Sequence, residues 1–387
     1  MKKTNAILGG LETTIFEVMS ALAVEHGAVN LGQGFPDTDG PEDIRRTAAD
    51  AIIEGPNQYP RMLGLPELRS AVAEHDRRFY GLDVDPDREV MVTSGATEAL
   101  ADCLFGLIEP GDEVVLIEPV YDTYLPVVRL AGGVPRIVRL EPPDWALPEA
   151  SLEAAFSPAT KLIVLNSPHN PVGKVFTESE LEHIARLVVH FDAFAVCDEV
   201  YEHLVFDGAR HRPLITMPGM RERCLRVGSA GKTFSLTGWK VGYVIAPPAL
   251  LAVAGKAHQY LTFTTAPNLQ RAVAYGLGKD DAYFASLADD MAKKRDRLIR
   301  GLASVGFEMM DSAGTYFVCA DFRSLGFNGT DEAFCRHITE HAGVAAVPLS
   351  AFYENADVDR FVRFCFCKQD HVLDEAIERL GRHFASA

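Results

Sequence analysis

The residues with the clearest chemical potential lie in one stretch, Val227–Lys240, in which a lysine stands among small residues. Lys232 follows Ser229 by three positions, and a second cation, Lys240, comes eight positions later. The stretch follows a strand-like segment that begins at Cys224, so Lys232 is expected on a turn at a strand end, where α/β proteins place their functional groups. An amine beside groups that can hold a phosphate indicates imine chemistry on pyridoxal phosphate (PLP).

Two other interpretations of Lys232 are open at this point. Most lysines are solvated and a glycine only indicates a turn, so a surface loop is the ordinary one. Gly231-Lys232-Thr233 also matches the end of the phosphate-binding P-loop, and Asp198 ends an apolar segment like the magnesium-binding acid of such nucleotide hydrolases. The spacing argues against a P-loop, because its first glycine would fall on Arg226 and Gly238 interrupts the helix that should follow.

PLP also needs an acid opposite its ring nitrogen, donors to its ring oxygen and a site for its phosphate. Ser94–Thr97 follows a strand and begins a helix, so its free N–H groups can hold a phosphate. Asp198 ends a buried strand, where a carboxylate needs a partner such as a protonated pyridinium nitrogen. Asn166 and Asn170 present two amides in a proline-rich turn. An ordinary capped helix and an ordinary turn remain alternatives for each feature taken alone.

Four motifs in order give the chain a resemblance to a known family. They are Asn166-x-Pro168-x-Asn170-Pro171-x-Gly173, Asp198-Glu-Val-Tyr201, Ser229-x-x-Lys232 and Gly238-Trp-Lys240-x-Gly242. In order and spacing the chain resembles the class I/II aminotransferases of the fold type I PLP-dependent enzymes, from Leu31-Gly-Gln-Gly34 to Arg363. The span 228–242 is similar to the subgroup of kynurenine, glutamine and methionine aminotransferases.

The resemblance implies roles around the cofactor ring for the residues at matching positions. Lys232 forms the covalent bond to the cofactor and moves the α-proton as general base and acid. Asp198 pairs with the ring nitrogen, and Tyr121 stacks on the ring. Asn170 and Tyr201 donate hydrogen bonds to the ring oxygen.

The resemblance also implies how the phosphate is held. The expected donors are Ser229, Lys240 and the amides of Ala96 and Thr97. Tyr59 matches a residue that reaches the phosphate of the neighbouring subunit, so a homodimer with shared active sites is expected. Many relatives carry arginine where Lys240 stands, and a lysine offers a point charge in place of a planar fork.

Arg363 lies on an apolar strand, and a buried arginine needs an anion. The resemblance implies that it binds the substrate α-carboxylate, assisted by Asn166, Asn170 and the loop of Gly34; a salt bridge to a neighbouring acid is the alternative. The positions that match the side-chain pocket are aromatic here, namely Phe16, Phe263 and Phe352. Apolar walls favour aromatic or sulfur-containing side chains over dicarboxylates. Thr264 and His169 depart from residues that are usual in the subgroup, which leaves the substrate open.

Composition excludes several classes of partner. The net charge of −17 disfavours nucleic acids and anionic membrane surfaces. The seven cysteines are odd in number and lie mostly in apolar segments, which is typical of a reducing compartment, and with no signal peptide or membrane span expected we predict a cytoplasmic protein. Cys365 and Cys367 share a strand face, but no second pair stands nearby to complete a metal site.

The 387 residues suggest about two domains. Strand and helix patterns alternate from residue 89 and predict a mostly parallel sheet of about seven strands between helices. The strands we identify are 89–93, 113–118, 161–166, 194–197, 224–227 and 241–246. We expect a large PLP-binding domain at 46–285 and a smaller α+β domain formed by both termini, 1–45 and 286–387. A long helix at 280–305 is expected to present a solvated cationic face.

The predicted reaction is a ping-pong transamination between a neutral aromatic, sulfur-containing or glutamine-like L-amino acid and a 2-oxo acid. A PLP-dependent carbon–sulfur β-lyase would use the same anchoring residues and stays open. A non-catalytic ligand sensor on this fold is disfavoured, because the chain has no amino-terminal basic helix-turn-helix segment.

Overall fold

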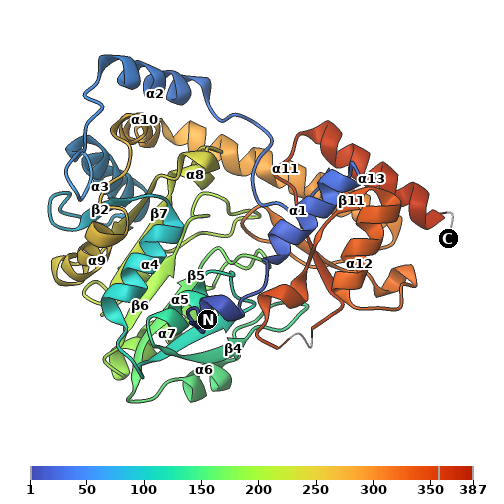
Figure 1. The fold of residues 1–387 in the computed structure, drawn as a ribbon, viewed down its shortest axis with the longest axis horizontal. Helices are drawn as coiled ribbons and strands as arrows, with labels where there is room; N and C mark the ends of the chain where they lie inside the picture. Colours follow the sequence, from blue (N-terminus) through green and yellow to red (C-terminus); the bar gives the residue numbers. More distant parts are fainter. Residues whose placement is uncertain (1, 356–357, 386–387) are drawn as a thin grey trace.

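The structure is a computed structural model, and it describes residues 2–355 and 358–385. Its largest element is a seven-stranded sheet between helices (Figure 1). In spatial order its strands are β2 (Val90–Thr93), β8 (Gly242–Ile245), β7 (Cys224–Ser229), β6 (Phe194–Asp198), β5 (Thr160–Asn166), β3 (Glu113–Glu118) and β4 (Val134–Arg139). Within this sheet only β8 runs antiparallel to its neighbours. The mostly parallel sheet expected from the alternating pattern is therefore confirmed.

Alternate residues of each central strand face opposite layers of helices. In β3, Val114 and Leu116 belong to one apolar core and Val115 and Ile117 to the other. The first core is closed by α4 (Ala96–Leu107), α5 (Tyr124–Leu130) and α9 (Pro248–Leu261). The second is closed by α2 (Glu42–Glu54), α3 (Pro66–Tyr80), α6 (Glu149–Ala155), α7 (Glu178–His190) and α10 (Pro267–Leu277). Burial on both faces explains why these strands are continuous apolar segments in the sequence.

The strand that the sequence analysis did not identify is β4, at one edge of the sheet. Its sequence, Val-Pro-Arg-Ile-Val-Arg, contains a proline and two arginines, and only Val138 is fully buried. Such composition is tolerated at an edge, where one side of the strand pairs with nothing, but it hides the apolar pattern of a strand. Residues 119–123 form a loop between β3 and α5.

The smaller part of the molecule is built from amino-terminal and carboxy-terminal segments of the chain (Figure 1). A four-stranded antiparallel sheet is formed, in order, by β12 (Val347–Pro348), β13 (Phe361–Cys365), β10 (Phe317–Asp321) and β9 (Glu308–Met309). The strand β1 (Val29–Asn30) pairs in parallel with β11 (Val344–Ala345), and helices α1 (Ile15–Glu25), α12 (Asp331–His337) and α13 (Asp370–Ala385) cover these strands. The amino-terminal segment thus packs on carboxy-terminal elements.

The domain boundaries near 46 and 285 stay a prediction, and positions 1, 356–357 and 386–387 of the predicted small domain lie outside the described residues. Short helices complete the fold: the 3₁₀ helices η1 (Leu8–Gly10), η2 (Leu214–Thr216), η3 (Thr237–Trp239), η4 (Arg323–Leu325) and η6 (Leu349–Phe352), the π-helix η5 (Ile338–Ala342) and the α-helix α8 (Ala230–Thr233). Among the described residues, no helix has both the length and the apolar composition that crossing a membrane requires.

The long helix α11 (Asp281–Val305) contacts two apolar cores, because Phe284 belongs to the second core of the large sheet and Leu302 to a separate core in the smaller part of the molecule. The solvated cationic face expected for it is wrong for Arg295, which is buried. Its guanidinium pairs with Asp207 and Asp296 and donates to the Ser312 carbonyl oxygen at 2.9 Å. The sequence pattern of one helix does not reveal this burial, because the covering segment comes from elsewhere in the chain.

Candidate active site

A cavity of about 400 Å³ lies where β5, β6 and β7 end, and its wall includes residues of both parts of the chain. Functional groups of open α/β sheets collect at the carboxyl ends of parallel strands, because loops from neighbouring strands meet there. Most of the residues singled out in the sequence line this cavity: Phe16, Gly34, Ala96, Thr97, Tyr121, Asn166, Asn170, Asp198, Tyr201, Ser229, Lys232, Lys240 and Arg363. The P-loop interpretation fails here, since the helix after β7 is only α8, four residues long.

Lys232 lies on α8, one turn beyond the end of β7, and points into the cavity. Its Nζ donates a hydrogen bond of 2.9 Å to the Tyr316 hydroxyl, which in turn donates to the Gly34 carbonyl oxygen at 2.5 Å. Nζ also lies 5.5 Å from the ring centroid of Tyr201. Burial lowers the pKa of the Lys232 ammonium, so a larger fraction of the amine is neutral and able to act as a nucleophile or base.

Asp198 is the last residue of β6 and is buried. The Tyr124 hydroxyl donates to its Oδ2 at 2.6 Å, and the Val200 N–H donates to Oδ1 at 3.4 Å. Burial raises the pKa of this carboxyl, and among the described residues it forms no ion pair. A buried carboxyl that faces a cavity without a cationic partner fits the protonated ring nitrogen of PLP.

Asn166, Asn170 and Arg363 form one hydrogen-bonded chain along the wall. The Asn166 side chain donates to the Asp198 carbonyl oxygen at 2.9 Å and accepts from the Asn170 backbone N–H at 2.7 Å. Arg363 donates to the Asn170 Oδ1 and to the Gly32 carbonyl oxygen, both at 2.9 Å. This buried guanidinium makes no ion pair within the described residues, and its Nε has no partner, which fits a site for a substrate carboxylate.

The beginning of α4 provides the expected phosphate site. Gly95 has a φ of +85°, and a Cβ there would lie 3.2 Å from the Cε of Lys240. A Cβ on Gly242 would lie 2.6 Å from the Gly95 carbonyl carbon, so β8 passes directly against this turn. Only glycines permit such close backbone approach, and they bring Lys240 beside the free N–H groups of Ala96 and Thr97.

Three residues singled out in the sequence do not line the cavity of this chain. Tyr59 is 82% exposed, and its ring lies 5.6 Å from that of Phe263, which is also on the surface. Phe352 is buried behind the wall, where its ring packs 5.8 Å from Phe16 and 5.1 Å from the guanidinium of Arg363. It therefore supports the wall and does not face the cavity.

The structure adds residues that the sequence analysis missed. Tyr316 bridges Lys232 and the Gly34 loop, yet it stands in no motif and is 84 positions from the lysine. Asp122 lines the cavity next to Tyr121, a neighbour that could have drawn attention to it. Gln33 lines the cavity, and its side chain donates a hydrogen bond of 2.5 Å to the Ser20 hydroxyl. This bond holds α1 next to the cavity. Cys365 and Cys367 have sulfurs 3.1 Å apart, as their spacing suggested.

The cavity therefore contains the groups that PLP needs: an amine with a lowered pKa, a buried acid, amide and hydroxyl donors, and a phosphate site. They are positioned by a mostly parallel sheet between helices and by the smaller part of the chain. The fold and this set of groups define a PLP-dependent enzyme of fold type I. The chain belongs to the family "Aminotransferase class I and II", whose pattern matches residues 26–380. It is thus an aminotransferase that acts on amino acids and oxo acids with PLP as cofactor.

Individual members of the family resemble the chain over nearly its whole length. The chain is 49% identical over 380 residues, 95% of this chain and 96% of the relative, to a probable N-succinyldiaminopimelate aminotransferase DapC of Mycobacterium tuberculosis. It is 40% identical to the methionine aminotransferase of Escherichia coli, with 96% of each chain covered. The solved structure of the M. tuberculosis N-succinyldiaminopimelate aminotransferase superposes with a TM-score of 0.96 over 98% of this chain and 100% of that chain. The resemblance to the family is confirmed.

Proposed function

We propose that the enzyme moves the amino group of a neutral aromatic, sulfur-containing or glutamine-like L-amino acid to a 2-oxo acid by a ping-pong mechanism. The observation that carries this proposal is the buried Arg363, which has no carboxylate partner among the described residues and lies in the same cavity as Lys232. The rings of Phe16, Tyr121 and Phe317 line that cavity as well. A guanidinium between aromatic walls, without an acidic partner in the part of the chain that the structure describes, suits one carboxylate and an uncharged side chain.

Each residue of the site then has a defined task. When bound, PLP supplies an electron-withdrawing ring that stabilises negative charge at the substrate α-carbon. With the cofactor bound, Lys232 would take the α-proton of the substrate and deliver it to the reacting carbon of the cofactor, and Tyr316 orients the Lys232 amine. Asp198 holds a proton at the ring nitrogen, and Arg363 binds the α-carboxylate through two parallel hydrogen bonds.

The remaining contacts of the cofactor are proposed from the same cavity. Asn170 and Tyr201 donate to the ring oxygen, and Tyr121 packs against the ring face. Ser229, Lys240 and the start of α4 hold the phosphate. Burial raises the pKa of the Tyr121 hydroxyl to about 12, so this side chain stays neutral beside the ring.

Charge in the cavity argues against dicarboxylate donors. The cations of its wall are Lys232, Lys240 and Arg363, and the proposed tasks use all of them. Asp122 adds a carboxylate to the wall, although burial raises its pKa. A second substrate carboxylate would therefore be desolvated without a partner from this chain.

A donor screen tests the substrate class. Each amino acid is incubated with several 2-oxo acids, and kcat/KM is compared between methionine, phenylalanine, kynurenine and glutamine on one side and aspartate and glutamate on the other. We expect the neutral donors to exceed the acidic ones by at least about tenfold, which corresponds to about 1.4 kcal/mol. N-succinyldiaminopimelate is included because of the name of the 49% identical relative. If this compound, aspartate or glutamate is the best donor, the proposed class is wrong.

A carbon–sulfur β-lyase differs only in what leaves after the α-proton is removed. Incubation with cystathionine in the absence of any oxo acid separates the two reactions. An aminotransferase stops after one half-reaction because its cofactor keeps the amino group. Continuous release of pyruvate and ammonia would contradict the proposal.

We also propose that the enzyme is a homodimer in which Tyr59 reaches the phosphate bound by the second subunit. Tyr59 and Tyr260 are each 82% exposed, and Leu261 and Phe263, which follow Tyr260 closely in the chain, are also exposed. Exposed aromatic residues are typical of the cores of subunit interfaces. Tyr260, Leu261 and Phe263 lie at the end of α9 and in the loop after it, and the Tyr59 ring packs 5.6 Å from that of Phe263. Contacts between α4 and α9 bring this surface close to the start of α4, which supports sharing of the phosphate site.

A cytoplasmic location remains our proposal for the protein. All seven cysteines are free thiols and buried, as in proteins of a reducing compartment.

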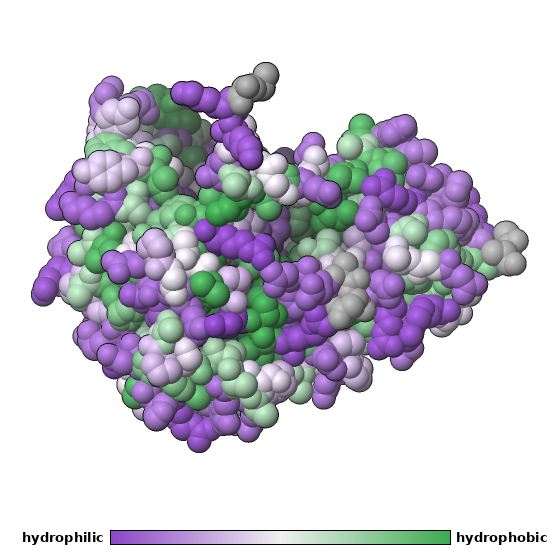
Figure 2. All heavy atoms as spheres, turned by 60° about the horizontal axis from the view of Figure 1, so that its bottom comes forward, coloured by the Kyte–Doolittle hydropathy of each residue, from purple (hydrophilic) through white to green (hydrophobic). Residues whose placement is uncertain are grey.

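On the face of the molecule in Figure 2, hydrophilic side chains predominate and hydrophobic ones form separate patches. The net charge of −17 supports the prediction that neither nucleic acid nor an anionic membrane is a partner.

A further inference from the structure

A second group of titratable side chains lies outside the cavity, behind the start of α4. Glu98 is the third residue of that helix, and it contacts His258 of α9, with Asp102 one helical turn further along. The side chains of His258 and Asp102 are fully buried, and that of Glu98 is nearly so. None of these three residues lines the cavity, although Ala96 and Thr97, just before Glu98, do.

Hydrogen bonding defines the charges of Glu98 and His258. The Nε2 of His258 lies 3.0 Å from the Met62 carbonyl oxygen, and Nδ1 lies 2.7 Å from the Glu98 Oε1. A carbonyl oxygen only accepts, so Nε2 carries a hydrogen, and Nδ1 must carry one as well to donate to a carboxylate. Burial opposes the charge, but the hydrogen bond to Glu98 raises the pKa of His258. The pair is thus an imidazolium and a carboxylate.

The Glu98 carboxylate accepts two further hydrogen bonds from groups near the cavity. Its Oε2 accepts the N–H of Ser94, and its Oε1 also accepts the hydroxyl of Thr262. The Ser94 hydroxyl in turn lies 2.8 Å from that of Thr265. One carboxylate therefore connects the turn before α4 with the segment after α9.

We propose that Glu98, held ionised by His258, is a positioning residue for the phosphate of the cofactor. Its hydrogen bond to Ser94 fixes the turn that presents the Ala96 and Thr97 N–H groups. A lone carboxylate this close to a phosphate would repel it, and the imidazolium of His258 cancels that charge. The inference rests on PLP as the cofactor and is independent of the donor substrate.

Asp102 provides a matched control. Both of its carboxylate oxygens are buried without a hydrogen-bond partner, and it makes no contact with the Ser94 turn in the described residues. Burial, together with the nearby charge of Glu98, raises its pKa to about 8, so it is mainly protonated at neutral pH. The neutral, isosteric variant Asp102→Asn keeps the shape of the cluster and leaves the contacts of Glu98 intact.

The test compares PLP with pyridoxal, which lacks the phosphate. The enzyme is freed of cofactor and titrated with each compound while tryptophan fluorescence is followed, Trp239 lying just before Lys240. For Glu98→Ala and His258→Gln, we expect the Kd of PLP to rise by about 10- to 100-fold, the effect of one or two lost charged hydrogen bonds, while the Kd of pyridoxal changes less than about twofold. Asp102→Asn should change neither Kd.

The conservative variant Glu98→Gln separates position from charge. Its amide oxygen still accepts from Ser94 and its NH₂ donates to a neutral His258, so PLP affinity should stay within about threefold of the wild type. The ³¹P chemical shift of the reconstituted enzymes should change with Glu98→Ala and not with Glu98→Gln. A parallel loss of PLP and pyridoxal binding, or wild-type PLP affinity in His258→Gln, would overturn the proposal. His258→Gln alone decides it if Glu98→Ala does not fold.

Discussion

At the scale of single residues, Arg363 is the side chain whose surroundings say most about the reaction. It is buried among Phe16, Phe317 and Phe352, with the Phe317 ring centroid 3.9 Å from the guanidinium carbon. Aromatic faces orient a guanidinium without neutralising it, so its charge remains available to an incoming carboxylate. The salt bridge to a neighbouring acid, left open from the sequence, is not formed among the described residues.

The variant Arg363→Lys tests this role. A lysine keeps the charge but loses the planar fork, so one of two hydrogen bonds to the carboxylate is lost. We expect KM for the amino donor to rise by about 10- to 100-fold, equivalent to about 1.5–3 kcal/mol, with a smaller change in kcat. Steady-state kinetics with saturating oxo acid measure both constants. An unchanged KM would show that the α-carboxylate binds elsewhere.

His169, in the turn after β5, predicts a pH dependence of stability. It is buried, its Nδ1 has no partner, and burial lowers its pKa from 6.5 to about 3. Between pH 6.5 and about 3 the unfolded chain binds a proton here and the folded chain does not, so stability falls as pH falls through this window. His169→Asn removes this contribution. From pH 7 to pH 5 the wild type should lose about 2 kcal/mol more than the variant.

Denaturant unfolding at the two pH values, at fixed concentrations of protein and PLP, measures this difference. The variant His26→Asn, at an exposed histidine, is measured alongside as the control. Equal pH dependence in His169→Asn and the wild type would contradict the prediction.

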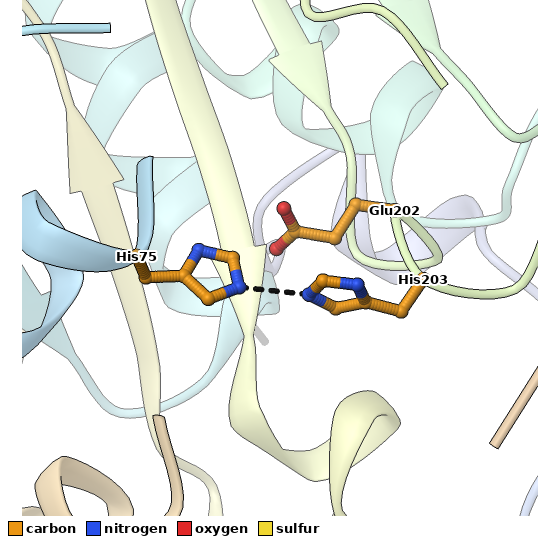
Figure 3. Close-up of side chains that lie close together, drawn as sticks. All are labelled: His75, Glu202 and His203. Atoms are coloured by element: carbon orange, nitrogen blue, oxygen red, sulfur yellow. Dashed lines mark hydrogen bonds between the residues drawn. The ribbon is translucent and has the colours of Figure 1, made fainter. Parts of the chain in front are cut away.

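At the scale of elements, a buried cluster of charged side chains holds β7 in place behind the site. Arg226 of β7 donates to Glu199 at 2.5 Å, to Asp76 of α3 at 2.9 Å, and to Glu202. Figure 3 shows the imidazoles of His75 and His203 pointing toward each other beside Glu202, with their Nε2 atoms 2.7 Å apart. These groups connect helix α3, strand β7 and the loop that follows β6. The position that a P-loop would give to glycine is therefore a structural arginine.

Removing this arginine should destabilise the fold strongly. Arg226→Met leaves three buried carboxylates without their common cation, and breaking a buried ion pair costs about 3–5 kcal/mol. The exposed pair of Arg46 and Glu42 gives the control, and Arg46→Met should leave the free energy of unfolding nearly unchanged. Urea unfolding of the PLP-bound enzymes compares the variants. A loss below about 1 kcal/mol for Arg226→Met would contradict the assignment.

At the scale of the whole molecule, the cavity needs both parts of the chain. Gly34, Phe317 and Arg363 come from the smaller part, and Lys232, Asp198 and Asn170 from the ends of the large sheet. The hydrogen bonds from Lys232 to Tyr316 and from Arg363 to Asn170 cross between them. These contacts connect the residues proposed to bind the substrate with those proposed to bind the cofactor. The proposed dimer extends this sharing to a second copy through Tyr59.

Subunit complementation tests that sharing. Lys232→Ala and Tyr59→Ala chains are co-expressed, so that mixed dimers form. If Tyr59 acts across the interface, one site of each mixed dimer combines a wild-type lysine with a wild-type tyrosine, and about a quarter of the wild-type activity should return. Separately expressed variants, mixed without subunit exchange, are the control. If Tyr59 acts within its own chain, co-expression restores nothing.

The sequence determined the chemistry where short-range patterns encode it. Strands that are buried on both faces and followed by Gly-, Pro- or Asn-rich turns identify both the sheet and the edge at which Lys232, Asp198, Asn166 and Asn170 meet, because residue type and spacing are local properties. The edge strand β4 escaped detection, because its partly exposed residues lack that pattern.

Only the tertiary structure decided the features that depend on contacts between distant segments. The hydrogen bond from Tyr316 to Gly34, the burial of Arg295 and the link from Glu98 to His258 join residues that no spacing rule relates. The same holds for Arg363, because only the packed arrangement of the surrounding elements shows that no acidic side chain within residues 2–355 and 358–385 pairs with it. Burial and desolvation exist only in the folded chain, and so do the protonation states that depend on them.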